Sequence, residues 1–109
     1  MNPYECFKLV DMRVGRILSA EDFPQARKAA YKLTIDFGEI GVRRSSAQIT
    51  ALYGKEELVG RLVIAVTNLQ PRRIAGFESQ VLVLGVPDRC NRVVLLEPAG
   101  DVEPGALVY

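Results

Sequence analysis

Two adjacent arginines, Arg72 and Arg73, follow a proline in a polar stretch that separates two apolar segments, 62–66 and 81–84. The proline restricts the backbone of the turn, and the apolar segments are expected to be buried strands that hold it in place. A guanidinium group binds phosphate through a planar fork of N–H donors and also stacks on nucleic-acid bases. The pair therefore predicts a ligand-binding loop, although surface ion pairs, for example to Glu78, would use the same side chains.

Serine and glutamine side chains precede a second candidate element. Ile49, Leu52 and Tyr53 recur at helical spacing, which predicts a short helix over residues 46–53 that ends at Gly54. The first turn of a helix presents free amide donors and a field that favours phosphate. Hydroxyl and amide side chains at such a place bind phosphates or base edges. Helix capping alone would also explain the two serines.

Three further positions carry groups suited to a ligand. Arg43 and Arg44 are consecutive in an expected strand, so they point to opposite faces and only one of them can face a given ligand. Asn68 offers a donor and an acceptor at the end of an apolar run, where turn formation is the alternative role. Phe77 follows a glycine and is interpreted as a plug at the end of the fold, with stacking on a base or a peptide side chain as the alternative.

The residues needed for catalysis are scarce. The 109-residue chain contains no histidine, which is the commonest general base and metal ligand. Its two cysteines, Cys6 and Cys90, have no sequence partners for a metal site and are expected to be free thiols. No phosphate-binding loop or nucleophile motif is present. We therefore expect a binding protein rather than an enzyme, with no metal and no cofactor.

Charge is distributed unevenly along the chain, although the net charge is only +1. Residues 40–77 carry six basic and two acidic side chains, whereas residues 78–109 carry two basic and five acidic ones. A locally basic segment attracts phosphate, although an ordinary solvated surface would also fit these counts.

Strand periodicity dominates the elements that position these residues. Apolar and polar residues alternate from residue 10 and again over 29–37, and the alternation slips at Gly15, which indicates a bend or bulge there. The expected strands lie near residues 10–20, 29–37, 42–45, 62–66, 81–84 and 93–96. The fold class is therefore all-β. We expect one domain, residues 1–109, forming an OB-fold: a five-stranded Greek-key barrel with a short helix between strands 3 and 4.

Membrane and export signals are missing from the sequence. No apolar run approaches the roughly 18 residues of a transmembrane helix. The first residues lack the basic and apolar regions of a signal peptide. We expect a cytoplasmic protein without membrane insertion.

Four motifs occur in order at separated places in the chain. They are D-M-R-V-G-R-I (11–17), S-S-A-Q-I-T (45–50), V-T-N-L-Q-P-R-R-I-A-G-F-E-S (66–79) and V-E-P-G (102–105). With them the chain resembles the tRNA-binding OB-fold domain family over essentially its whole length. Within that family it is most similar to the branch of CsaA export-related chaperones. Many tRNA-binding members have a small residue and methionine after the serine of the third motif; here Ser79 is followed by Gln80-Val81, a departure that fits the CsaA branch and weakens the case for tRNA binding.

The resemblance implies more than the residues do by themselves. It implies an OB barrel without enzymatic activity, a homodimer in which the chain ends help to form the interface, and binding of tRNA by shape more than by sequence. The CsaA branch further implies binding of unfolded or presecretory polypeptides in grooves at the dimer interface.

Two functional hypotheses follow. A third, that the chain is a structural subunit of a larger assembly, stays open. The first is a homodimeric protein that binds structured RNA, such as tRNA, by shape and phosphate contacts. The alternative is a chaperone that binds unfolded or presecretory polypeptides for protein export, with Phe77 as a candidate peptide contact. The expected RNA-binding residues are Arg43, Arg44, Ser46, Gln48, Asn68, Arg72, Arg73 and Ser79.

Overall fold

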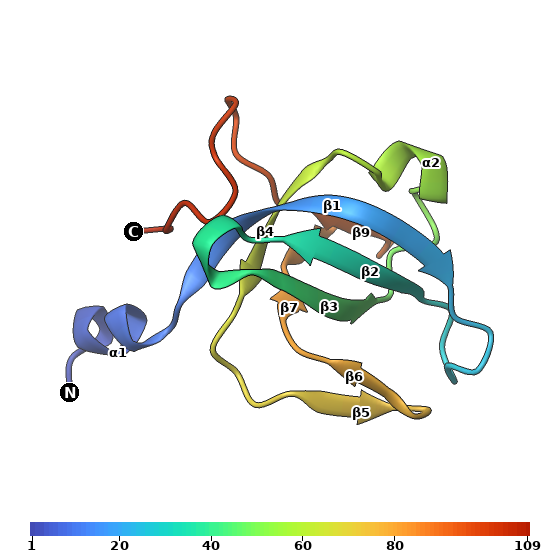
Figure 1. The fold of residues 1–109 in the computed structure, drawn as a ribbon, viewed down its shortest axis with the longest axis horizontal. Coiled ribbons are helices and arrows are strands. Elements are labelled where there is room, and N and C mark those ends of the chain that lie inside the picture. Colours follow the sequence, from blue (N-terminus) through green and yellow to red (C-terminus); the bar gives the residue numbers. More distant parts are fainter.

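Strand β1 (Met12–Asp22) is the longest element and belongs to both halves of a small barrel (Figure 1). In the computed structural model, which describes residues 1–109, β1 pairs through its first half with β4 and through its second half with β2. All neighbours in the sheet are antiparallel. Its five strands, in spatial order, are β3 (Val42–Ala47), β2 (Tyr31–Asp36), β1, β4 (Leu62–Val66) and β7 (Leu82–Val83).

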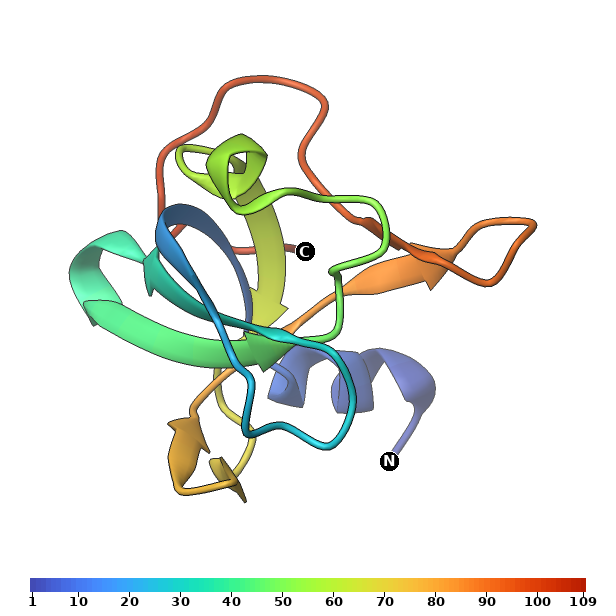
Figure 2. The same cartoon turned by 90° about the vertical axis from the view of Figure 1, so that its right-hand side faces the viewer.

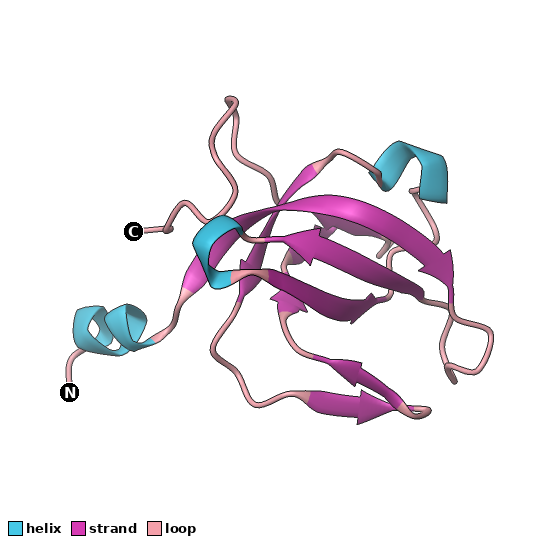
Figure 3. Cartoon of the chain, in the orientation of Figure 1, coloured by secondary structure: helices cyan, strands magenta, loops and turns pink.

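Two hairpins and three short helical segments complete the chain (Figure 3). The hairpins are β5 (Arg72–Ile74) with β6 (Phe77–Ser79), and β8 (Gly85–Pro87) with β9 (Val93–Leu95). The helical segments are α1 (Pro3–Leu9), the 3-10 turn η1 (Gly38–Ile40) and α2 (Lys55–Leu58). The turn of the β8–β9 hairpin projects away from the barrel in Figure 2. None of the helices is long and apolar enough to cross a membrane.

The expected all-β barrel with a short helix between the third and fourth strands is confirmed, but the helix was expected in the wrong place. Residues 45–47 continue β3 in register with β2, so the serines do not begin a helix. The helix forms instead at α2, where Gly54 is the residue before the first turn and its N–H donates to Glu57 Oε1 at 2.9 Å. The helical spacing of Ile49 reflects burial in the core, since only 4% of this residue is exposed.

Gly15 marks close packing, not the bulge expected there. The pairing of β1 with β2 shifts register between Ile17 and Ser19, two to four residues later. Gly15 lies against the core, where an added Cβ would stand 2.5 Å from Ile35 Cγ2 and 2.6 Å from Phe37 Cε1. The glycine therefore lets β1 approach the ring of Phe37.

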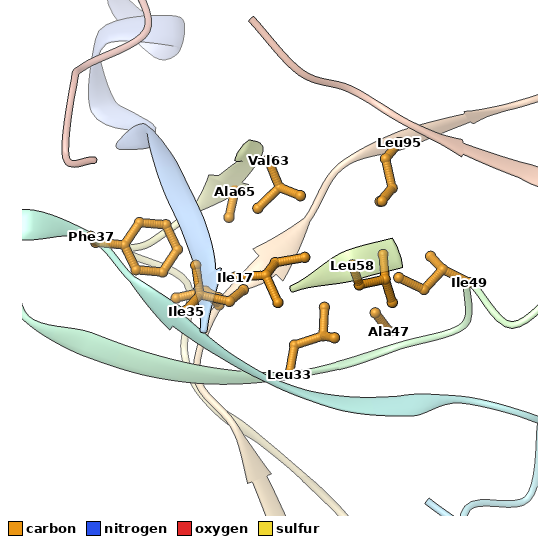
Figure 4. Packing of buried hydrophobic residues seen from close by; sticks show 11 residues of the cluster. Ile17, Leu33, Ile35, Phe37, Ala47, Ile49, Leu58, Val63, Ala65 and Leu95 are labelled. Atoms are coloured by element: carbon orange, nitrogen blue, oxygen red, sulfur yellow. The ribbon is translucent and has the colours of Figure 1, made fainter. Parts of the chain in front are cut away.

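The core is one cluster of apolar side chains inside the barrel (Figure 4). Leu33, Ile35 and Phe37 alternate along and just beyond β2, and all three are fully buried. Leu58 of α2 belongs to this cluster and is also fully buried. The strict alternation in β2 explains why its apolar residues could be recognised in the sequence.

The barrel is closed between β3 and the segment after β6 largely by side chains. Gln80 exchanges two hydrogen bonds with the main chain of Arg44: the Gln80 N–H donates to the Arg44 carbonyl, and Gln80 Oε1 accepts from the Arg44 N–H, both at 2.8 Å. Ser79 Oγ accepts from the N–H of Ser46 at 2.9 Å, and Ser45 Oγ donates to the carbonyl of Val81 at 3.0 Å. We call this closure the seam.

Helix α1 was not expected from the sequence. Asn2 caps it by accepting the N–H of Glu5 at 2.9 Å, and a proline opens its first turn. No residue of α1 is buried, and the helix stands off the barrel beside the C-terminal segment (Figure 1). A seven-residue helix with no buried face has little stability by itself.

Candidate nucleic-acid interface

Three adjoining cavities lie between the end of β3, the β5–β6 hairpin and the loop from β1 to β2. All three are lined by Ser46, Arg72 and Ile74, and their volumes are about 110, 310 and 260 Å³. We call this continuous depression the basic groove. Three cationic side chains line it, Arg27, Lys28 and Arg72, and no carboxylate does.

The two arginines of β5 have different surroundings. Successive side chains of a strand point to opposite faces, so Arg72 and Ile74 line the basic groove whereas Arg73 does not. The Arg73 guanidinium donates to the carbonyl of Gly76 at 3.1 Å. It forms no ion pair with Glu78, its partner across the hairpin. The side chain of the exposed Arg72 makes no ion pair or hydrogen bond within the chain, so its charge is available to a ligand.

Arg43 and Arg44 lie on opposite faces of β3, as expected, and neither lines the basic groove. The Arg43 guanidinium donates to the carbonyl of Ile40 at 2.7 Å. The Arg44 guanidinium pairs with Glu21 at 3.1 Å and lies 4.7 Å from the ring centre of Phe77. The charge of Arg44 is therefore partly neutralised within the chain.

Ser46, Ser79 and Gln48 share one edge of the barrel but have different roles. The side chain of Ser46 lines the basic groove, and its main-chain N–H belongs to the seam. Ser79 is only 9% exposed, and its hydroxyl accepts the Ser46 N–H. Gln48 is exposed, lines two of the three cavities, and makes no hydrogen bond within the chain. Of the three, Gln48 has the most groups free for a ligand.

Phe77 is a plug, since 8% of the residue is exposed. Its ring meets that of Phe23 edge to face, with 5.5 Å between ring centres. The ammonium group of Lys32 lies 4.8 Å from the centre of the Phe23 ring and 5.5 Å from that of Phe77. The two rings therefore pack the loop after β1 against the β5–β6 hairpin, and this loop brings Arg27 and Lys28 to the groove.

Arg27 and Lys28 were missed in the sequence. They stand in a loop of mixed charge, and residues 1–39 as a whole are balanced, so a count of charges does not single them out. The available signal was topological, because OB-folds bind ligands with the loops that join the first two strands and the last two. The neighbouring carboxylates Glu21 and Asp22 pair elsewhere, with Arg44 and Lys55. Neither carboxylate therefore neutralises Arg27 or Lys28.

Asn68 lies outside the basic groove, at the junction of α1, β1 and β4. Its Nδ2 donates to the carbonyl of Leu9 at 2.8 Å, and its Oδ1 accepts the N–H of Asp11 at 2.9 Å. The Asp11 carboxylate accepts hydrogen bonds from Arg13 and Thr67, and the first of these is the main reason why the pKa of Asp11 lies below its ordinary value. Both ends of the Asn68 amide are thus engaged in holding α1 to the barrel.

Acidic side chains gather on another part of the surface. Glu57, Glu97 and Asp101 line an open depression together with Arg61, which pairs with Glu97 at 3.2 Å. No group of three or more histidine, cysteine or acidic residues is placed to hold a metal ion, and Cys6 and Cys90 are exposed free thiols. The small net charge therefore coexists with a groove lined by cations and a separate depression lined mainly by carboxylates.

Known proteins resemble this chain over nearly its whole length. Residues 12–107 match the family described as "Putative tRNA binding domain". The chain is 42% identical over 103 residues to methionine–tRNA ligase 1 of Sorangium cellulosum, covering 94% of the chain and 14% of the ligase. It therefore spans about one seventh of that relative.

Two solved structures share the fold from end to end. The crystal structure of chaperone CsaA from Bacillus anthracis has a TM-score of 0.92 and 46% identity, covering 100% of this chain and 99% of that one. The CsaA chaperone protein from Picrophilus torridus has a TM-score of 0.93 and 48% identity, with both chains covered completely. With the match over residues 12–107, these likenesses show that the chain belongs to the tRNA-binding domain family.

Proposed function

We propose that this chain is a non-enzymatic protein that binds structured RNA, in particular tRNA, through the basic groove. One observation carries the proposal: three cations line the groove, and no carboxylate among the lining residues neutralises them. Such a surface attracts phosphate and releases the counterions condensed on RNA. Membership of the tRNA-binding domain family supports the same ligand.

The roles of the groove residues follow from their chemistry. Arg27, Lys28 and Arg72 contact phosphates, and Ser46 and Gln48 orient the RNA through hydrogen bonds. Contacts to phosphates follow the path of the backbone, so they recognise shape more than sequence. The proposal leaves out Asn68, whose amide is occupied within the chain, and Ser79, which is nearly buried. It assigns no direct contact to Arg43, Arg44 or Arg73.

A titration of fluorescently labelled tRNA at several salt concentrations tests this function. With three phosphate contacts, the logarithm of the association constant should fall with the logarithm of salt concentration with a slope of about −2 to −3. Anisotropy of the labelled tRNA measures both quantities. Absence of saturable binding at 50 mM salt would remove the proposal.

We further propose that the chain is a homodimer that associates through a surface at its two ends, the terminal patch. Six apolar residues line a cavity of about 270 Å³ on this surface: Tyr4, Phe7, Val10, Leu107, Val108 and Tyr109. The side chains of Tyr4 and Leu107 are widely exposed, at 67% and 50% of the residue. Covering this surface with a second copy would give α1 the buried face that it lacks.

The mass of the protein in solution tests the dimer. We expect twice the chain mass of 12.0 kDa for the unaltered protein and 12.0 kDa for Leu107→Asp, because a carboxylate cannot be buried in an apolar interface without a partner. Leu18→Asp is the matched control, since Leu18 is similarly exposed, at 46%, and lies outside the terminal patch. A single-chain mass for the unaltered protein in analytical ultracentrifugation would refute the dimer.

A second function, capture of unfolded or presecretory polypeptides, is favoured by one observation. The chain is 46% and 48% identical, over its full length, to two proteins described as CsaA chaperones. Within a dimer, grooves beside the terminal patch would supply the apolar surface for an extended peptide. Binding of a labelled extended peptide, measured beside single-stranded and duplex RNA, separates this function from RNA binding.

A further inference from the structure

We propose that the basic groove holds an unpaired nucleotide with its base inserted, so that the protein recognises unstacked residues of a folded RNA. This inference rests on the proposed function and specifies which part of the RNA the groove takes. A helix of paired bases would place only phosphates and sugars on the same surface. An unpaired nucleotide would place a base in the groove, whereas a duplex would place only its backbone there.

The floor of the groove is apolar. The largest of the three cavities, of about 310 Å³, is lined by six hydrophobic residues: Ala47, Ile49, Ile74, Leu82, Val83 and Val93. Phosphates and sugars of a duplex would leave this floor without a contact, whereas the face of a base would cover it. The volume is at the lower end of the range of roughly 300–1,000 Å³ for small-molecule sites, which suits one inserted ring system.

The edge of β3 supplies polar groups beside that floor. Alternate residues of β3 direct their main-chain groups to the outer edge, where the N–H groups of Arg44 and Ser46 are taken by Gln80 and Ser79. The next residue in this series is Gln48, and neither its main chain nor its side chain makes a hydrogen bond within the chain. Gln48 therefore offers donors and acceptors together, as the hydrogen-bonding edge of a base requires.

The same edge disfavours an added peptide strand. A bound strand needs several consecutive main-chain positions with free groups. At this edge, the positions of Arg44 and Ser46 are already occupied by the seam, and beside the groove only that of Gln48 is free. One position fits the edge of a single base better than the backbone of a strand.

The cations lie where the phosphates of an inserted nucleotide would be. Arg72 lines all three cavities, and Arg27 and Lys28 line the cavity on the side of the β1–β2 loop. A guanidinium at this rim pairs with phosphate or stacks on the base. An apolar floor, a free polar edge and a cationic rim together match the three parts of a nucleotide.

Binding of three labelled ligands tests the inference: a single-stranded RNA, a blunt RNA duplex of equal length, and an extended peptide. We expect the single strand to bind more tightly than the duplex and to compete with tRNA. Leu82→Ser and Gln48→Ala should each lower its affinity roughly 5- to 100-fold without changing the salt slope. Leu18→Ser is the control for Leu82→Ser because both leucines are 46% exposed and Leu18 lies outside the groove.

Each outcome distinguishes the inference from the function on which it rests. If the duplex binds as well as the single strand, or neither variant weakens binding, the nucleotide site is wrong while RNA binding stands. If tRNA and both RNAs fail to bind, the proposed function is wrong as well. If the peptide binds and Leu82→Ser abolishes that binding alone, the groove is a peptide site. Circular dichroism of each variant verifies that the fold is intact.

Discussion

Replacing Arg27, Lys28 and Arg72 together by alanine should lower the affinity for tRNA by about two orders of magnitude at 0.1 M salt. Each cation that contacts a phosphate contributes about 0.7–0.9 to the salt slope, so the three replacements should flatten it by about 2–3. All three residues are exposed and line the basic groove. The fold should therefore remain intact, and the loss should be confined to binding.

The control for this variant is Arg89→Ala. Arg89 is exposed in the turn between β8 and β9, outside the basic groove, and its removal also takes away one positive charge. If binding depends only on the total charge of the protein, Arg89→Ala will flatten the slope as much as Arg72→Ala does. Equal effects of the two single variants would show that the RNA does not bind in the basic groove.

The barrel itself was predictable because its signals are local and periodic. Residues 31–37 alternate strictly between core and surface, and the structure buries Leu33, Ile35 and Phe37 completely. The alternation that starts at residue 10 also predicted a long first strand. In the structure this strand, β1, pairs with β4 through one half and with β2 through the other. The alternation of apolar and polar residues determines which face of such a strand is buried, without knowledge of its long-range contacts.

No local periodic pattern predicted the position of helix α2 or the contribution of the β1–β2 loop to the basic groove. Ile49 and Tyr53 show helical spacing because both pack against the core from an irregular segment. Arg27 and Lys28 become part of a site only when Phe23 packs on Phe77 and brings their loop to the hairpin. Such contacts join segments about fifty residues apart, and no local pattern encodes them.

Two glutamines, Gln48 and Gln80, show most directly what could not be predicted from the sequence alone. Gln48 was expected to contact RNA, and Gln80 was only a departure from a family pattern. In the structure Gln80 closes the seam against Arg44, whereas Gln48 has no partner. The residue type is the same, and only the position relative to the edge of β3 separates a structural role from a binding role.

Replacing Ser79 and Gln80 together by alanine should therefore lower the free energy of unfolding by about 2–4 kcal/mol. The change leaves the main-chain N–H groups of Ser46 and Arg44 without their partners at a part-buried edge, and each such loss costs about 1–3 kcal/mol. For a chain of this size the melting temperature should fall by roughly 10 °C or more. Urea denaturation and thermal melting followed by circular dichroism measure both changes.

Gln48→Ala is the matched control, because it removes the same amide group from a residue that makes no hydrogen bond within the chain. Its free energy of unfolding should stay within about 0.5 kcal/mol of the unaltered protein, since exposed substitutions without partners change stability little. The double variant should therefore lower the free energy of unfolding, whereas Gln48→Ala should lower the affinity for RNA. If Gln48→Ala destabilised the protein as much as the double variant does, the hydrogen bonds of the seam would not be the cause of the loss. A residue without any hydrogen bond would then contribute as much stability as the two residues that make them.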